Sequence, residues 1–246
     1  MSSHRFYRAR GNLAAMRNIN PPNAIDLARE AFTPVTFPAL VLRSPELLSA
    51  PRGDGSKVLV WPGFGAGNAS TAFLRNYLDY LGYSARGWQM GANNGDVLKL
   101  LELLGQQTID QAADEPVTLI GWSLGGYLAR EVARDLPQHV KQVITLGSPV
   151  VGGPKYTAVA AAFDTQGQSL DDIERLVDER YETPIQTPVT AIYSRFDGVV
   201  AWEACIDHLT PDIEHIEITC THTGMGFSPK ALLIIADRLA QQQQRH

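Results

Sequence analysis

The residues of this chain best suited to chemistry lie in Val117–Gly126, which reads Val-Thr-Leu-Ile-Gly-Trp-Ser-Leu-Gly-Gly. The first four residues form a short apolar, β-branched run, which is typical of a buried strand. The next five follow the Gly-x-Ser-x-Gly spacing, in which a serine sits on a tight turn between a strand and a helix. The glycines allow the two backbones to approach, and the helix N-terminus favours negative charge beside the hydroxyl. The segment therefore predicts Ser123 as a nucleophile.

A serine nucleophile needs a base within hydrogen-bond reach and an acid that orients the base. The chain has six histidines, and His222 is the one that follows a predicted strand (213–220) and precedes the last helix. Asp197 follows another predicted strand, Val189–Tyr193. Both loops leave the sheet at the edge where Ser123 emerges, so we predict a triad of Ser123, Asp197 and His222. A surface histidine and an ordinary Asp-Gly turn are the competing interpretations.

The tetrahedral oxyanion of such a reaction requires backbone N–H donors. One donor is predicted to be the amide of Leu124, directly after the serine. The second is expected from the glycine-rich loop 62–67, most simply the amide of Phe64. A phosphate-binding loop is the alternative for this segment, but it lacks the Lys-Ser/Thr of a P-loop.

The elements that must position these residues alternate between strands and helices after Lys57. This order predicts an α/β fold with a mostly parallel central sheet and helices on both faces. We expect residues 57–246 to form this domain, and 1–56 to be an irregular segment packed on the core, with a short helix at 24–32 and an edge strand at 37–42. Residues 153–187 carry no strand signal, and predict either a small helical cap or a crossover helix with a long loop.

Composition excludes several classes of function. The net charge of −5 gives no basic face for nucleic acid. The first 17 residues are rich in arginine but lack the apolar run of a secretory signal, and no window is long and apolar enough to span a membrane. The two cysteines lack metal-ligand spacing. We expect a cytoplasmic protein without metal or cofactor; its oligomeric state is not predicted.

These motifs resemble the α/β-hydrolase superfamily over roughly residues 57–239. The resemblance rests on the serine turn, on Asp197 and His222 in that chain order, and on Pro62-Gly63-Phe64 at the place of the oxyanion loop. Thr221–Met225 looks like the histidine loop of some bacterial lipase-like members. The resemblance implies an eight-stranded sheet and acyl transfer through an acyl-enzyme. The first strands of that sheet are not evident before Lys57, which predicts a shortened sheet.

The expected function is hydrolysis of a small acyl ester or thioester. An acyltransferase using the same triad and a non-catalytic hydrolase-like binding protein are the alternatives. An apolar acyl pocket is predicted from large residues near the catalytic edge: Trp88, Met90, Trp122, Val150, Val151, Val199, Val200 and Trp202.

Overall fold

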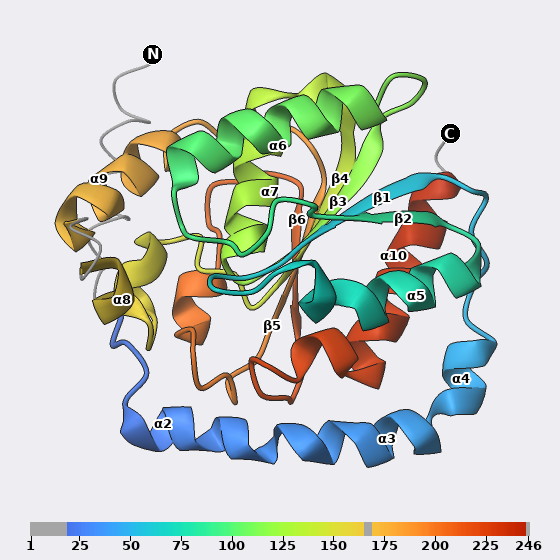
Figure 1. The fold of residues 1–246 in the computed structure, drawn as a ribbon, viewed down its shortest axis with the longest axis horizontal. Coiled ribbons are helices and arrows are strands. Elements are labelled where there is room, and N and C mark those ends of the chain that lie inside the picture. Colours follow the sequence, from blue (N-terminus) through green and yellow to red (C-terminus); the bar gives the residue numbers. More distant parts are fainter. Residues whose placement is uncertain (1–18, 165–168, 245–246) are drawn as a thin grey trace.

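A six-stranded, entirely parallel sheet forms the centre of the computed structural model, which describes residues 19–164 and 169–244. The strand order is β2-β1-β3-β4-β5-β6. The strands are β1 (Lys57–Trp61), β2 (Ser84–Gly87), β3 (Val117–Trp122), β4 (Val140–Leu146), β5 (Val189–Tyr193) and β6 (Ile213–Glu217). The predicted fold class is confirmed: helices cover both faces of a parallel sheet (Figure 1).

Alternate residues of each central strand enter two different cores. In β1, Val58 and Val60 pack with α5 (Ala72–Leu81) and α10 (Pro229–Gln243). Leu59 and Trp61 point to the opposite face, where they pack with α6 (Val97–Gln111) and α7 (Leu124–Asp135). Because both of their faces are buried, the central strands β1 and β3 read as nearly continuous apolar runs rather than alternating ones.

The segment before β1 is mostly helical. It consists of α2 (Ala24–Ala28), η1 (Arg29–Val35), α3 (Thr36–Leu42) and α4 (Ser44–Leu48). Asn23 caps α2, and a capping box with Asp26 fixes its start. We call these four elements the N-terminal strap. In Figure 1, α2 to α3 run along the lower edge of the molecule, and α4 turns upward at its right side.

The edge strand predicted at 37–42 is wrong, because these residues form α3. Pro38 lies in the first turn of that helix, where a missing N–H is tolerated, and Ala and Leu follow it. The short apolar run has no strand periodicity strong enough to distinguish the two structures. The sheet consequently has six strands within the described residues, fewer than the eight that the resemblance implied.

Between β4 and β5 the chain forms η4 (Gly153–Tyr156), α8 (Ala160–Asp164) and α9 (Leu170–Tyr181). Four residues of this stretch, 165–168, lie outside the described part of the chain. The remaining short turns are η2 (Asn68–Thr71), η3 (Pro137–His139), η5 (Trp202–Cys205) and η6 (Met225–Phe227). In the described residues, no helix combines the length and the apolar character that crossing a membrane demands.

Candidate active site

Ser123 occupies a strained turn between β3 and α7. Its φ of 54° and ψ of −124° lie in a region that non-glycine residues rarely adopt. The neighbouring glycines explain how the turn is possible. A Cβ at Gly121 would overlap the Gly125 carbonyl, and a Cβ at Gly125 would lie 2.6 Å from the Pro62 carbonyl oxygen. The Ser123 N–H donates to the Leu146 carbonyl at 2.8 Å, which ties the turn to β4.

The loop after β1 runs directly against the serine. A Cβ built on Gly63 would lie 3.0 Å from Ser123 Cβ. Phe64, the next residue, lines the same cavity as Ser123. On the other side, α7 begins at Leu124, so this N–H belongs to the first turn, where donors lack an intrahelical acceptor. The two predicted oxyanion residues therefore flank the serine.

Asn93, which sequence reasoning missed, holds in place the loop that is predicted to supply an oxyanion donor. Its fully buried side chain donates to the Pro62 carbonyl at 3.0 Å. Its backbone forms two hydrogen bonds of 2.8 Å, one with Gly65 and one with Ala66. The Asn-Asn-Gly sequence signals only a turn, and gives no hint of this role.

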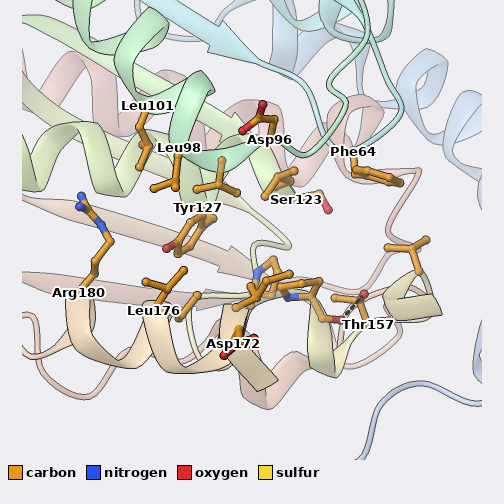
Figure 2. A pocket seen from close by; sticks show the side chains of 18 of the residues that line it. Phe64, Asp96, Leu98, Leu101, Ser123, Tyr127, Thr157, Asp172, Leu176 and Arg180 are labelled. Carbon is orange, nitrogen blue, oxygen red and sulfur yellow. Dashed lines mark hydrogen bonds between the residues drawn. The ribbon is translucent and has the colours of Figure 1, made fainter. Parts of the chain in front are cut away.

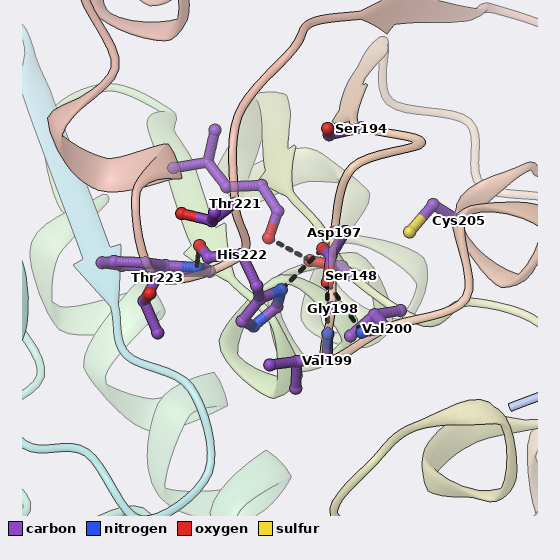
Figure 3. A network of polar contacts seen from close by, with 12 residues as sticks. Ser148, Ser194, Asp197, Gly198, Val199, Val200, Cys205, Thr221, His222 and Thr223 are labelled. Atoms are coloured by element: carbon purple, nitrogen blue, oxygen red, sulfur yellow. Dashed lines mark hydrogen bonds and ion pairs between the residues drawn. The ribbon is translucent and has the colours of Figure 1, made fainter. Parts of the chain in front are cut away.

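Asp197 and His222 are in direct contact, as Figure 3 shows, with 2.7 Å between Asp197 Oδ2 and His222 Nδ1. Because an ionised carboxylate only accepts, Nδ1 carries the proton. The second carboxylate oxygen accepts the N–H groups of Val199 and Val200, each at 2.8 Å. The Asp197 side chain is 1% exposed. Packing and hydrogen bonds thus fix the face that Asp197 presents to the imidazole.

The charge balance around His222 favours its protonated form. Burial opposes the imidazolium, but the charge and hydrogen bond of Asp197 and the charge of Glu30 outweigh it. The pKa of His222 is therefore raised above its ordinary value. A base with a raised pKa takes a proton from a hydroxyl more readily.

Ser123 and the Asp197–His222 pair emerge from the carboxyl edge of the sheet, after β3, β5 and β6. Trp122 connects them, because its indole Nε1 donates to the His222 carbonyl at 3.2 Å. Within the described residues, the Ser123 hydroxyl forms no hydrogen bond with His222. Catalytic hydrogen bonds are often long in ligand-free enzymes and tighten when substrate binds.

An apolar cavity of about 380 Å³ opens at Ser123 (Figure 2). Its walls come from the Phe64 loop, α6, α7, η4 and α9. Leu98, Leu101, Tyr127 and Leu176 supply much of the apolar surface. The cavity ends toward Arg180, whose guanidinium is paired with Glu131 and Asp135.

The structure places the residues predicted to form the acyl pocket outside the lining of this cavity. None of the eight, all of which the structure describes, lines this cavity. Trp88 is fully buried in the core, and Val150 and Val151 form a separate cluster. Trp88, Met90 and Trp122 pack with the core, whereas the cavity is lined mostly by residues of α6, α7 and α9.

Glu30 was also missed. From η1 of the N-terminal strap, its carboxylate accepts backbone N–H groups of Gly198, His222 and Thr223. No local sequence pattern indicates this contact, since the partners lie far along the chain.

The weaker candidates lie elsewhere. Asp207 is buried in an ion pair with Arg130 and accepts the Tyr181 hydroxyl at 2.7 Å, and its pKa is lowered because these partners outweigh burial. His215 Nε2 accepts the Asp207 N–H, and the pKa of His215 is lowered by burial. The His208 N–H donates to the Tyr181 hydroxyl. Asp212 is exposed. His4 and His246 fall outside the described residues.

The parallel sheet and the serine turn define an α/β-hydrolase, and the comparisons agree. Residues 72–200, more than half of the chain, match the family described as thioesterase domain, and the chain belongs to this family. The resemblance to the α/β-hydrolase superfamily is thereby confirmed.

Two curated relatives are pimeloyl-[acyl-carrier protein] methyl ester esterases. The one from Photobacterium profundum is 26% identical over 143 residues, 54% of this chain and 52% of its own length. The one from Edwardsiella ictaluri is 32% identical over 117 residues, 44% of this chain and 41% of its own length. The chain thus spans about half the length, or less, of the curated relatives that it matches.

Among solved structures, the monoacylglycerol lipase of Paleococcus ferrophilus superposes with a TM-score of 0.61 at 14% identity. The superposition covers 78% of this chain and 97% of the lipase. At this identity the likeness establishes the fold alone.

Proposed function

We propose that this protein is a serine hydrolase that cleaves carboxylic esters or thioesters through an acyl-enzyme. One observation carries the proposal: Ser123 sits on a strained turn facing an apolar cavity, beside a buried Asp197–His222 pair. Strained backbone persists where the surrounding structure enforces it, and it gathers at active sites.

In the proposed reaction, Ser123 Oγ attacks the acyl carbonyl carbon and His222 Nε2 takes the hydroxyl proton. Asp197 keeps the proton on Nδ1, so that Nε2 is free to accept, and stabilises the imidazolium. The amides of Phe64 and Leu124 hold the oxyanion, each donor contributing on the order of 3 kcal/mol in the transition state. His222 then protonates the leaving alcohol or thiol, and water releases the acid from Ser123.

The cavity favours an apolar acyl group. Aliphatic and aromatic side chains from α6, α7 and α9 form its walls. The Arg180 charge at its end is matched by Glu131 and Asp135, so the wall formed by the described residues offers no uncompensated cation for an acidic tail. We assign α8 and α9, within residues 153–187, as a cap over this pocket. The family match and the names of the curated relatives support both ester and thioester bonds as candidates.

The test compares wild type and Ser123→Ala on p-nitrophenyl esters from acetate to palmitate, on aliphatic methyl esters and on acyl thioesters. Ser49→Ala, at an exposed site that follows α4, is the matched control. We expect activity and fluorophosphonate labelling in wild type and Ser49→Ala, and neither in Ser123→Ala. A folded wild type that resists labelling and cleaves none of these substrates contradicts the proposal.

A further inference from the structure

The loops that carry Asp197 and His222 are joined through a single side chain from outside the sheet. Glu30 Oε1 accepts the N–H of Gly198 at 2.9 Å and the N–H of His222 at 2.8 Å. Glu30 Oε2 accepts the N–H and the hydroxyl of Thr223, at 2.9 and 2.6 Å. One carboxylate therefore binds the residue after the aspartate, the histidine itself and the residue after it.

Further contacts of the strap show that this arrangement is built rather than incidental. The Thr33 hydroxyl lies 2.7 Å from that of Thr221 and 2.6 Å from that of Thr223. Phe32 packs on Phe196 with ring centroids 6.1 Å apart. The strap thus touches both catalytic loops at several points.

Gly198 shows how closely the strap approaches. A Cβ at this position would lie 3.1 Å from Glu30 Oε1 and would overlap the Asp26 carbonyl. Any side chain here would push the strap away from the Asp197 loop.

The same carboxylate is also an electrostatic neighbour of the histidine. Burial raises the pKa of Glu30, but the Thr223 hydroxyl and the three backbone donors outweigh it, so the pKa is lowered and Glu30 is anionic at neutral pH. The charges that act on the His222 ring come from Asp197, after β5, and Glu30, in η1. Cys220 adds none, because burial raises the pKa of its thiol to about 12.

We propose that Glu30 is a positioning residue for the triad: it fixes the Asp197 and His222 loops to each other and adds a second negative charge behind the imidazole. The proposal rests on the proposed function in taking these two residues as catalytic. Glu30 binds the backbone of the two loops and the Thr223 hydroxyl rather than the side chains of Ser123, Asp197 or His222. It acts through His222, so its loss must alter the histidine itself.

The experiment compares Glu30→Gln with Glu46→Gln, which removes the same charge from an exposed site of the same strap. The pKa of His222 is measured by NMR of ¹⁵N-histidine-labelled protein, assigned with His222→Ala. The pH profile of kcat/KM is measured on a p-nitrophenyl ester. Circular dichroism in urea shows that each variant is folded.

We expect the pKa of His222 to fall in Glu30→Gln, because a negative charge beside the imidazolium is lost. The acid limb of the kcat/KM profile moves to lower pH with it. The pH-independent value of kcat/KM drops roughly tenfold or more, because the two loops are no longer held in position relative to each other. Glu46→Gln matches wild type in all three measurements. A merely structural role would lower stability and leave the pKa of His222 unchanged.

An unchanged His222 pKa together with a wild-type plateau in folded Glu30→Gln overturns the proposal. If that variant does not fold, Glu30→Asp keeps the charge but withdraws the carboxylate by one methylene. It is expected to lose rate with a smaller change in the pKa of His222, and a wild-type rate overturns the proposal. Full activity of Ser123→Ala refutes the proposed function instead, and the NMR titration, which needs no turnover, still decides the role of Glu30.

Discussion

Replacing Asp197 with asparagine tests the triad most sharply, because the structure dictates how the amide must sit. In the wild type, Oδ1 accepts the Val199 and Val200 N–H groups and Oδ2 accepts from His222. The asparagine oxygen must keep the two backbone donors, since the opposite orientation leaves them facing an NH₂ group. Each buried donor left unsatisfied costs about 1–3 kcal/mol.

The NH₂ group that Asp197→Asn introduces therefore points at His222 Nδ1, which must become an acceptor. The proton moves to Nε2, the nitrogen that has to take the serine proton, and the base is blocked. A wrong tautomer in such a triad costs roughly 10⁴-fold in kcat. At 1.36 kcal/mol per tenfold, this is about 5.4 kcal/mol of transition-state stabilisation.

The assay is kcat and KM on a short p-nitrophenyl ester, with active-site titration by a fluorophosphonate. Asp212→Asn, at an exposed position before β6, is the matched control and should retain the wild-type rate. A kcat of Asp197→Asn within tenfold of the wild-type value would refute the reasoning. Neither the tautomer of His222 nor the charge of Asp197 would then matter for the rate.

Three further outcomes follow from the geometry. Because Asp197 and Glu30 outweigh burial and raise the pKa of His222, activity should be lost as pH falls through a value above the ordinary imidazole pKa. An acid limb of kcat/KM at or below that ordinary pKa disagrees with the site. Gly125→Ala places a methyl group against the Trp61 and Pro62 carbonyls, and should lower the free energy of unfolding by about 3 kcal/mol in urea denaturation. Leu101→Phe fills part of the cavity, so the preferred p-nitrophenyl ester should become shorter while acetate cleavage persists; an unchanged chain-length preference rules out this cavity as the acyl pocket.

The parts of the fold that could be predicted are those encoded locally. The glycines around Ser123 are required by backbone contacts within a few residues, so their spacing is visible in the sequence. The positions of Asp197 and His222 follow from strand order, because the loops after parallel strands share one edge. The structure places these two in contact, although their roles remain a proposal.

The features that escaped prediction depend on distant packing. Phe37–Leu42 lies in helix α3, and an apolar run this short does not distinguish a helix from a strand. The cavity is lined by helix residues such as Leu98 and Leu176, which are 72% and 45% exposed. These leucines are not needed to fill the core. Their role in the cavity becomes evident only from the structure, in which α6 and α9 lie on opposite sides of it.

The contact between Glu30 and the His222 loop spans 192 residues of the chain. During synthesis the strap emerges before the histidine loop, so the two can meet only after all six strands of the sheet have been made. Closing so long a loop has an entropic cost. Contacts between its ends offset that cost only after the sheet has brought them together. Under the proposed roles of Glu30 and His222, the active site is completed late in folding, and we expect chains cut before the histidine loop to keep the serine turn but lack activity.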